Sequence, residues 1–130
     1  MVKQASKVLL LVTLALALLA ACTQQPVYNV EAFPVSVNIS LDDIEKAILT
    51  AGTRRGWRMT AVSPGMIEGQ LIIREHMALV EIPYSSQQYS IHYKDSSGLG
   101  YSDGSIHRNY NLWVRNLEKS INQEIIRQSN

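Results

Sequence analysis

The only cysteine of this chain, Cys22, stands at the end of an apolar run near the N-terminus. Positive charge from Lys3 and Lys7 precedes the run, which covers residues 8–19 and is followed by small residues. This order of charge, apolar stretch and small residues is typical of an export signal, which is removed from the mature protein. The 12 residues of the run are fewer than the roughly 20 that a membrane-spanning helix needs. We therefore expect residues 1–21 to be cleaved off and the fold to be built from the rest.

The four residues from Leu19 to Cys22 read Leu-Ala-Ala-Cys. They resemble, at every position, the lipobox of bacterial lipoproteins, in which a leucine and two small residues precede a cysteine. The resemblance implies that Cys22 receives two acyl chains through a thioether, becomes the first residue after cleavage, and is then acylated on its amino group. Several chains on one residue satisfy the need for at least two signals in stable membrane anchoring. The alternative is a free or disulfide-bonded cysteine, and an internal disulfide is excluded because the sequence has one cysteine.

The residue that follows the cysteine is Thr23. In lipoproteins of Gram-negative bacteria an aspartate at this position usually retains the protein in the inner membrane, so the resemblance implies transfer to the outer membrane. We expect the acyl chains on Cys22 to hold the mature chain in the lipid bilayer of the bacterial outer membrane, at its periplasmic face. Export to the cell surface stays open.

The mature chain is short and nearly neutral. Residues 22–130 number 109, enough for one domain with a modest core. Loss of Lys3 and Lys7 leaves ten basic side chains against eleven acidic ones. A nucleic-acid-binding surface needs clustered lysine and arginine, so we expect no nucleic-acid partner.

Residues 22–33 show no hydrophobic periodicity and contain Pro26. Such a stretch is typical of a loop, so we predict a lipidated tether between the anchor and the domain. The eleven residues after Cys22 in this stretch would reach at most about 35 Å when extended. The folded part is then a single α+β domain of residues 34–130.

Apolar spacing predicts the elements of this domain. Apolar residues three or four apart, after an N-cap at Ser40 and before Gly56, predict a helix over residues 41–54. The same spacing predicts a second helix from an N-cap at Ser105 to about Arg127. Alternating residues predict strands over 35–39, 57–62, 66–74, 77–82 and 88–94.

Short turns between the later strands predict an antiparallel meander. Two helices with one apolar stripe each are expected to be buried against one face of the sheet. The predicted fold is therefore α+β, with two layers: an antiparallel meander sheet of about four to five strands, and two helices on one face, in the order β-α-β-β-β-β-α. This order resembles the helix-grip arrangement in domains of an outer-membrane barrel-assembly lipoprotein, a likeness of topology that carries no function.

Four motifs follow one another along the domain: R-G-W at residues 55–57, H-x-A-x-V-x-I-x-Y at 76–84, Y-S-I-x-Y at 89–93, and I-H-x-x-Y-N-x-W at 106–113. With the lipobox, they resemble a family of small, uncharacterised proteobacterial lipoproteins of the outer membrane. The family pattern has an asparagine before the leucine of the loop where this chain has Gly98. The family brings no established activity, so the resemblance implies a place in the cell envelope but no reaction.

Histidine and serine patterns do not indicate a catalytic or metal site. His76, His92 and His107 fall on a predicted turn, strand and helix, with no pair at the spacing of metal ligands. No serine stands in the G-x-S-x-G motif of a nucleophile elbow, and the sequence offers no set of nucleophile, base and orienting group. We expect no enzyme, no metal and no cofactor beyond the acyl chains on Cys22.

Two functions of different classes are compatible with the sequence. The preferred one is a non-enzymatic accessory or interaction module of the cell envelope, which docks its sheet, an edge strand or its tether on an envelope protein. The alternative is a binding module for a small envelope ligand, a glycan or lipid, in a groove near the loop of residues 95–104. An aromatic concavity would favour the ligand, and a flat apolar patch would favour the protein partner. The candidate surface residues for either are His92, Tyr93, Tyr101, His107 and Tyr110.

Overall fold

The computed structural model describes residues 2–130, without the side chains of residue 2 and residues 17–22. The lipidation that the sequence predicts at Cys22 concerns a side chain outside this description. In chain order the elements are α1 (Val2–Thr23), β1 (Gln24–Pro26), β2 (Val30–Pro34), α2 (Leu41–Arg54), β3 (Arg58–Ser63), β4 (Met66–Ile73), β5 (His76–Pro83), β6 (Gln88–Ser97), β7 (Ser105–His107) and α3 (Arg108–Gln128).

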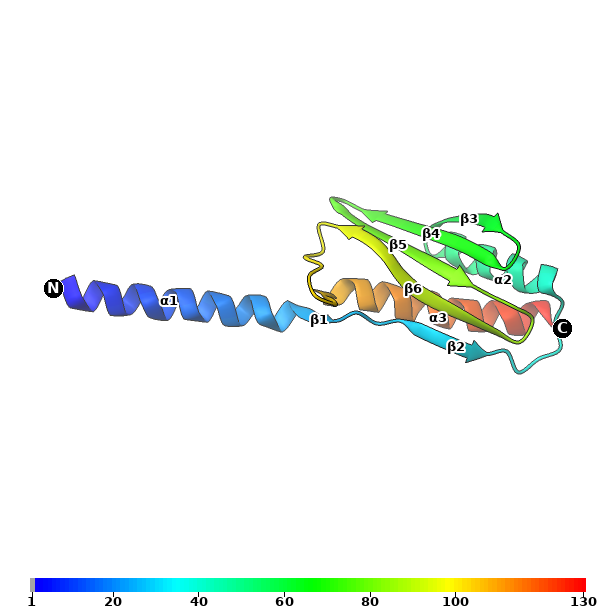
Figure 1. The fold of residues 1–130 in the computed structure, drawn as a ribbon, viewed down its shortest axis with the longest axis horizontal. Helices are drawn as coiled ribbons and strands as arrows, with labels where there is room; N and C mark the ends of the chain where they lie inside the picture. The colour runs from blue at the N-terminus through cyan, green and yellow to red at the C-terminus, as the bar shows by residue number, and fades with distance from the viewer. Residues whose placement is uncertain (1) are drawn as a thin grey trace.

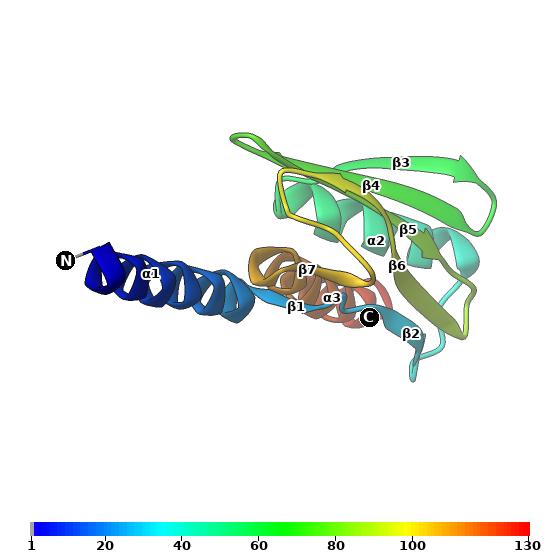
Figure 2. The same cartoon turned by 60° about the vertical axis from the view of Figure 1, so that its left-hand side comes forward.

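A five-stranded antiparallel sheet in the order β2-β6-β5-β4-β3 forms one layer of the domain (Figure 1). β1 and β7 form a separate two-stranded antiparallel ladder. α2 and α3 lie side by side across one face of the large sheet, as Figures 1 and 2 both show. The predicted two-layer α+β fold, with two helices on one face of an antiparallel sheet, is confirmed.

The core lies between the helices and the sheet, because alternate strand residues and one stripe of each helix point into that space. In β4 and β5, buried residues alternate with half-buried ones over most of each strand. The largest fully buried side chains are Tyr89, Tyr110, Ile44, Ile48, Ile67, Ile82, Ile91, Ile106, Leu117, Ile121, Val80 and Val114. Both helices and all three middle strands of the sheet therefore contribute to one apolar core.

The bounds of α2 agree with the prediction from sequence. The Oγ of Ser40 accepts a hydrogen bond from the backbone N–H of Asp43 at 3.1 Å and donates one to its carboxylate at 2.9 Å. Beyond the other end, Gly56 has a φ of 85°, a left-handed conformation that glycine adopts without steric cost. Across the helix pair, the guanidinium of Arg54 lies 2.8 Å from the buried carboxylate of Glu124 in α3.

The N-terminal part of the domain differs from the prediction. The first strand of the large sheet is β2, at residues 30–34, whereas residues 35–39 form no strand. The sequence predicts a free tether over residues 22–33. From Gln24 onward this prediction is wrong, because β1 pairs with β7 and β2 pairs with β6. Both pairings join segments about 60 to 80 residues apart in the chain, and local sequence patterns do not report partners at that distance.

The start of the last helix also differs. α3 begins at Arg108, and its N-cap is His107, whose Nδ1 accepts a hydrogen bond from the backbone N–H of Asn109 at 3.1 Å. Ser105, the predicted cap, lies instead in β7. β6 continues through Ser97, which leaves a loop of residues 98–104 before β7.

Among the described residues, no helix combines the length and the hydropathy needed to cross a bilayer.

Candidate functional site

Tyr93, Tyr101 and Tyr110 form one aromatic stack beside the 98–104 loop. The ring centroids of Tyr93 and Tyr101 lie 4.3 Å apart at an interplanar angle of 18°, and Tyr110 meets Tyr93 edge-on at 5.6 Å and 73°. Tyr101 keeps 47% of its surface exposed, whereas Tyr110 is fully buried. Three of the five predicted surface residues therefore come together, with Tyr101 as the outermost ring.

The hydroxyl groups of this stack do not form an acid–base pair. Burial raises the pKa of the Tyr110 phenol, and burial is also the main reason that the pKa of Tyr93 is raised. The Tyr93 hydroxyl shares a hydrogen bond with Ser96 Oγ at 2.8 Å, while the Tyr110 hydroxyl has no hydrogen-bond partner in the described structure. At neutral pH both phenols stay protonated, so the stack offers an aromatic surface.

The 98–104 loop is attached to the domain by several hydrogen bonds. The backbone N–H of His107 donates to the carbonyl of Leu99 at 2.9 Å, and that of Val27 donates to the carbonyl of Gly104 at 2.8 Å. His76 Nδ1 lies 2.9 Å from the carbonyl oxygen of Gly98. The side chain of Leu99 is buried. The loop is therefore fixed to the residue after β1, to β7 and to the start of β5.

His92 lies apart from the tyrosine stack. Successive side chains of a strand point to opposite faces, so His92 occupies the outer face of the sheet while Tyr93 faces the helices. His92 Nε2 is 2.9 Å from a carboxylate oxygen of Glu31. On the same face, Lys94 Nζ lies 2.8 Å from Glu68 and 3.0 Å from Glu81. The outer face across β4, β5 and β6 thus carries paired charges, unlike the flat apolar patch that would mark a sheet-docking surface.

The three histidines have separate environments. His76 contacts the loop carbonyl of Gly98, His92 contacts Glu31, and His107 caps α3. Within the part of the chain that the structure describes, no group of three or more His, Cys, Asp or Glu side chains is placed to hold a metal ion. His107 is a helix cap by its position, so its ring is already engaged with the backbone of Asn109.

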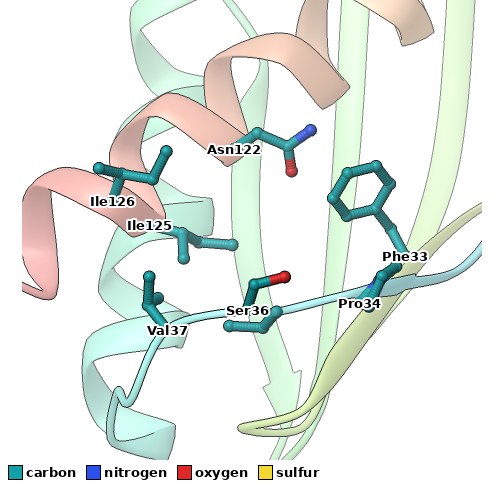
Figure 3. A pocket seen from close by; sticks show the side chains of 8 residues that line it. Phe33, Pro34, Ser36, Val37, Asn122, Ile125 and Ile126 are labelled. Carbon is teal, nitrogen blue, oxygen red and sulfur yellow. The ribbon is translucent and has the colours of Figure 1, made fainter.

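An apolar hollow on the domain was not predicted from the sequence. It lies between the chain that leaves β2 and the last two turns of α3, and its volume is about 240 Å³. Figure 3 shows Phe33 and Val37 on one side and Ile125, Ile126 and Asn122 of α3 on the other. We call it the β2–α3 groove; its lining is Phe33, Pro34, Val35, Ser36, Val37, Asn122, Ile125 and Ile126.

One polar group of this groove, the side-chain carbonyl of Asn122, is already occupied. Asn122 Oδ1 accepts a hydrogen bond from the buried hydroxyl of Tyr89 at 2.6 Å, and the Tyr89 ring packs against Phe33 at 5.6 Å between centroids. Ile126, at the rim, keeps 56% of its surface exposed. The groove can therefore bind an apolar group but offers little to orient a polar one.

Sequence reasoning missed the groove because its two walls are distant in the chain. The alternation of Val35, Val37 and Ile39 indicates a strand in the sheet. In the structure these residues form no strand, and Val35 and Val37 line the groove opposite the end of α3. The signal that could have indicated it is Ile126, an apolar residue adjacent to the buried stripe of α3 and outside it.

Comparisons with models of known protein families, with curated proteins and with solved structures gave no match for this chain.

Proposed function

We propose that the mature chain is a non-enzymatic interaction module, held by acyl chains on Cys22 at the periplasmic face of the bacterial outer membrane. In this proposal the β2–α3 groove receives an apolar side chain of an envelope protein. The support for the anchor is the lipobox resemblance at Leu19 to Cys22. The observation that supports the docking role is the apolar lining of the groove, of which Pro34 and Ile126 are exposed.

The size of the groove favours a side chain over a free ligand. Pockets for small molecules usually measure about 300–1,000 Å³ and carry a few polar groups that fix the ligand. The β2–α3 groove is smaller, at about 240 Å³, and its amide, Asn122, is engaged with Tyr89. A leucine- or phenylalanine-sized group inserted from a partner would bury apolar surface on both sides, which is the main source of binding free energy in such contacts.

The position of the groove suits a partner in the periplasm. β1, which follows the proposed anchor, lies near the start of α3, and the groove lies near the end of α3 (Figure 1). From Arg108 to Ile125 the helix rises by about 25 Å at 1.5 Å per residue. A bilayer that holds Cys22 would therefore leave the groove open on the far side of the domain.

The alternative, a glycan or lipid site beside the 95–104 loop, has less support. A ligand-binding aromatic cluster presents several rings to one hollow. Here Tyr110 is fully buried and one face of Tyr93 is covered by Tyr101, so Tyr101 is the ring most open to a ligand.

The proposal is tested by photo-crosslinking in the bacterium that makes the protein. A photoreactive amino acid replaces Ser36, an exposed residue of the groove wall, and the captured species are identified by mass spectrometry. We expect one recurrent protein product that is lost when Ile126→Asp places a charge at the groove rim. The matched control is Val62→Asp on β3, because Val62 is 53% and Ile126 56% exposed; the product should persist in that variant.

Three results would contradict the proposal. Persistence of the same product in Ile126→Asp would mean that the groove is not the contact, and capture of glycan or lipid alone would favour the ligand alternative. An N-terminal peptide without acyl mass on Cys22 would overturn the anchor. Thermal unfolding of both variants checks that the substitutions leave the fold intact.

A further inference from the structure

The proposed anchor is joined to the fold almost without a linker. Only Thr23 separates Cys22 from β1, which pairs with β7 at Gln24 opposite His107 and Gln25 opposite Ile106. From Cys22 to Gln24 the chain spans at most about 7 Å. If Cys22 carries acyl chains, as the proposed function states, the surface around β1 lies next to the lipid headgroups. The domain then cannot stand off the bilayer as a long tether would allow.

Three other segments surround β1 at this end of the domain. α3 starts at Arg108, directly after β7. The 98–104 loop is attached to β7 through the hydrogen bond from His107 N–H to the Leu99 carbonyl, and the start of β5, directly after the β4–β5 turn, is attached to the loop through His76 and Gly98. Figures 1 and 2 both show these segments at the end of the domain from which α1 extends. We call this surface the anchor-side end.

The anchor-side end exposes apolar and basic side chains together. Leu112 in the second turn of α3 is 53% exposed, Ile72 near the β4–β5 turn is 63% exposed, and Tyr101 is 47% exposed. Arg108, four residues before Leu112 on α3, and Arg74, in the β4–β5 turn, are exposed at this end as well, as are the acidic residues Glu75 and Asp103. Tyrosine and arginine suit a membrane interface, because each combines an apolar body with a polar tip that stays among headgroups and water.

The polar character of the next part of α3 limits how deep this end can lie. Arg115 stacks over the Tyr28 ring at 4.3 Å, and the Tyr28 hydroxyl donates to Glu118 at 2.8 Å. This charged group stands about two turns along the helix from Arg108, or about 10 Å. Contact with the bilayer would therefore be confined to the first turns of α3, the 98–104 loop and the β4–β5 turn.

We propose that the anchor-side end rests in the headgroup region of the bilayer that holds the acyl chains, with Tyr101 and Leu112 at the lipid boundary and Arg74 and Arg108 among the phosphates. The acyl chains keep this surface at a high effective concentration near the bilayer, so contacts too weak to bind a free protein are sufficient. The consequence is a fixed orientation, in which α3 leads away from the membrane and presents the β2–α3 groove outward.

The test uses the full lipidated protein in vesicles of phosphatidylethanolamine with a minor share of phosphatidylglycerol. Acylation leaves no free thiol in the mature chain, so a cysteine introduced at Leu112, Tyr101 or Ile126 carries the only fluorescent label. Lipids with a spin label on the acyl chain then quench any fluorophore that reaches the lipid boundary. Leu112 and Ile126 are matched positions, because they lie on one helix, four turns and about 21 Å apart, with exposures of 53% and 56%.

We expect quenching at Leu112 and Tyr101 to be at least about threefold that at Ile126, since about 21 Å of helix separates the ends. Equal quenching at Leu112 and Ile126 would overturn the inference. In a second variant, Tyr101→Asp combined with Arg108→Glu should lower quenching at Leu112 toward the Ile126 level. Unchanged quenching there would show that the short connection alone positions the domain and that the side chains do not bind lipid.

Failure of this inference can be told apart from failure of the proposed function. The mass of the N-terminal peptide reports acylation of Cys22 independently of the fluorophores. A peptide without acyl chains contradicts the anchor itself. An acylated peptide together with equal quenching at Leu112 and Ile126 contradicts only the inference that the anchor-side end lies on the bilayer.

Discussion

Tyr89 and Tyr110 are both fully buried in the same core, but their hydroxyl groups differ. The Tyr89 hydroxyl donates to Asn122 Oδ1 at 2.6 Å, whereas the Tyr110 hydroxyl has no partner in the described structure. A buried polar group without a partner loses its hydrogen bonds to water on folding and gains none in return. The two residues therefore form a natural pair for measuring what a core hydroxyl contributes.

Replacing Tyr110 by phenylalanine should leave the free energy of unfolding unchanged or raise it by about 1 kcal/mol, because a desolvation cost is removed. Tyr89→Phe should lower it by about 1 kcal/mol, because a hydrogen bond is lost and the Asn122 carbonyl loses its donor. Urea unfolding followed by tryptophan fluorescence measures both. A larger loss for Tyr110→Phe than for Tyr89→Phe would show that the Tyr110 hydroxyl has a partner in solution.

The environment of these tyrosine side chains could be predicted from the sequence only in part. The spacing along α3 placed Tyr110 on a stripe of apolar residues, and the side chain is indeed buried. The sequence also suggested Tyr110 as a surface candidate, which its burial excludes in this conformation. Whether a buried hydroxyl finds a partner depends on atoms from other elements, such as Asn122 for Tyr89, and sequence spacing does not report them.

At the scale of elements, the 98–104 loop depends on one close backbone approach. Gly98 has a φ of 71°, and a Cβ built there would lie 2.6 Å from the carbonyl oxygen of Glu75 in the β4–β5 turn. Gly104, at the other end of the loop, has a φ of 76° but no atom within 4 Å of such a Cβ. The two glycines share a left-handed conformation and differ in the space around them.

Gly104→Ala should therefore cost about 1–2 kcal/mol, the penalty of a side chain in a left-handed conformation. Gly98→Ala should cost more, because the loop also has to move away from the turn and the contact between His76 and the Gly98 carbonyl is weakened. Thermal unfolding compares the two variants, and hydrogen exchange of the His107 amide reports opening of the loop. Equal costs at both glycines would contradict the close approach.

Helices and strands whose signals lie within their own residues could be predicted from the sequence, and those that depend on distant partners could not. α2 was predicted at its observed bounds, because its cap at Ser40, its apolar stripe and Gly56 are all local signals. β4, β5 and β6 were predicted because their apolar residues alternate and short turns join them. β1 and β7 are three residues each and form only by pairing with each other across the chain, so no local pattern indicates them.

The missed strand β2 has a specific cause. Its alternation is interrupted at Ala32, which has a φ of 47° and lies where the pairing with β6 shifts register. The next residues, Val35 to Ile39, do alternate in burial, yet beyond the hydrogen bond from the Val35 N–H to the Gln87 carbonyl they form no strand. Alternation in sequence reports which side chains are covered; it does not report whether the backbone has a partner.

For the molecule as a whole, the tyrosines set a limit on stability at alkaline pH. Burial is the largest cause of the raised pKa values of Tyr84, Tyr89, Tyr93 and Tyr110, and a hydrogen bond to Glu118 is the largest for Tyr28. An unfolded tyrosine ionises near pH 10, while these side chains release their protons only at higher pH in the folded state. The folded state then binds more protons than the unfolded state, so stability is full below about pH 10 and falls as the pH rises.

The free energy of unfolding should thus be nearly flat with respect to tyrosine ionisation up to about pH 9.5 and fall above about pH 10, by up to about 1.4 kcal/mol per pH unit for each retained proton. Urea unfolding across this range measures the slope. Tyr110→Phe should make the slope shallower by about one proton. An unchanged slope in that variant would mean that Tyr110 ionises in the folded protein as readily as in the unfolded one.

One part of the candidate site could be predicted from the sequence and another part could not. The sequence identified Tyr93, Tyr101 and Tyr110, which the fold brings together. It could not indicate the β2–α3 groove, whose walls come from residues 33–37 and 122–126. A groove formed by segments nearly ninety residues apart exists only once the sheet and α3 are assembled.

The pairing of β1 with β7 has a mechanical consequence. In the proposed arrangement, with acyl chains on Cys22 and a partner in the β2–α3 groove, a pulling force between the two would enter the domain through Thr23 and reach this three-residue ladder before the core. Opening of the ladder would release residues 24–29, a connection of at most about 20 Å when extended, while β2 stays paired with β6. The domain could then yield to a change in distance between the membrane and its partner without unfolding.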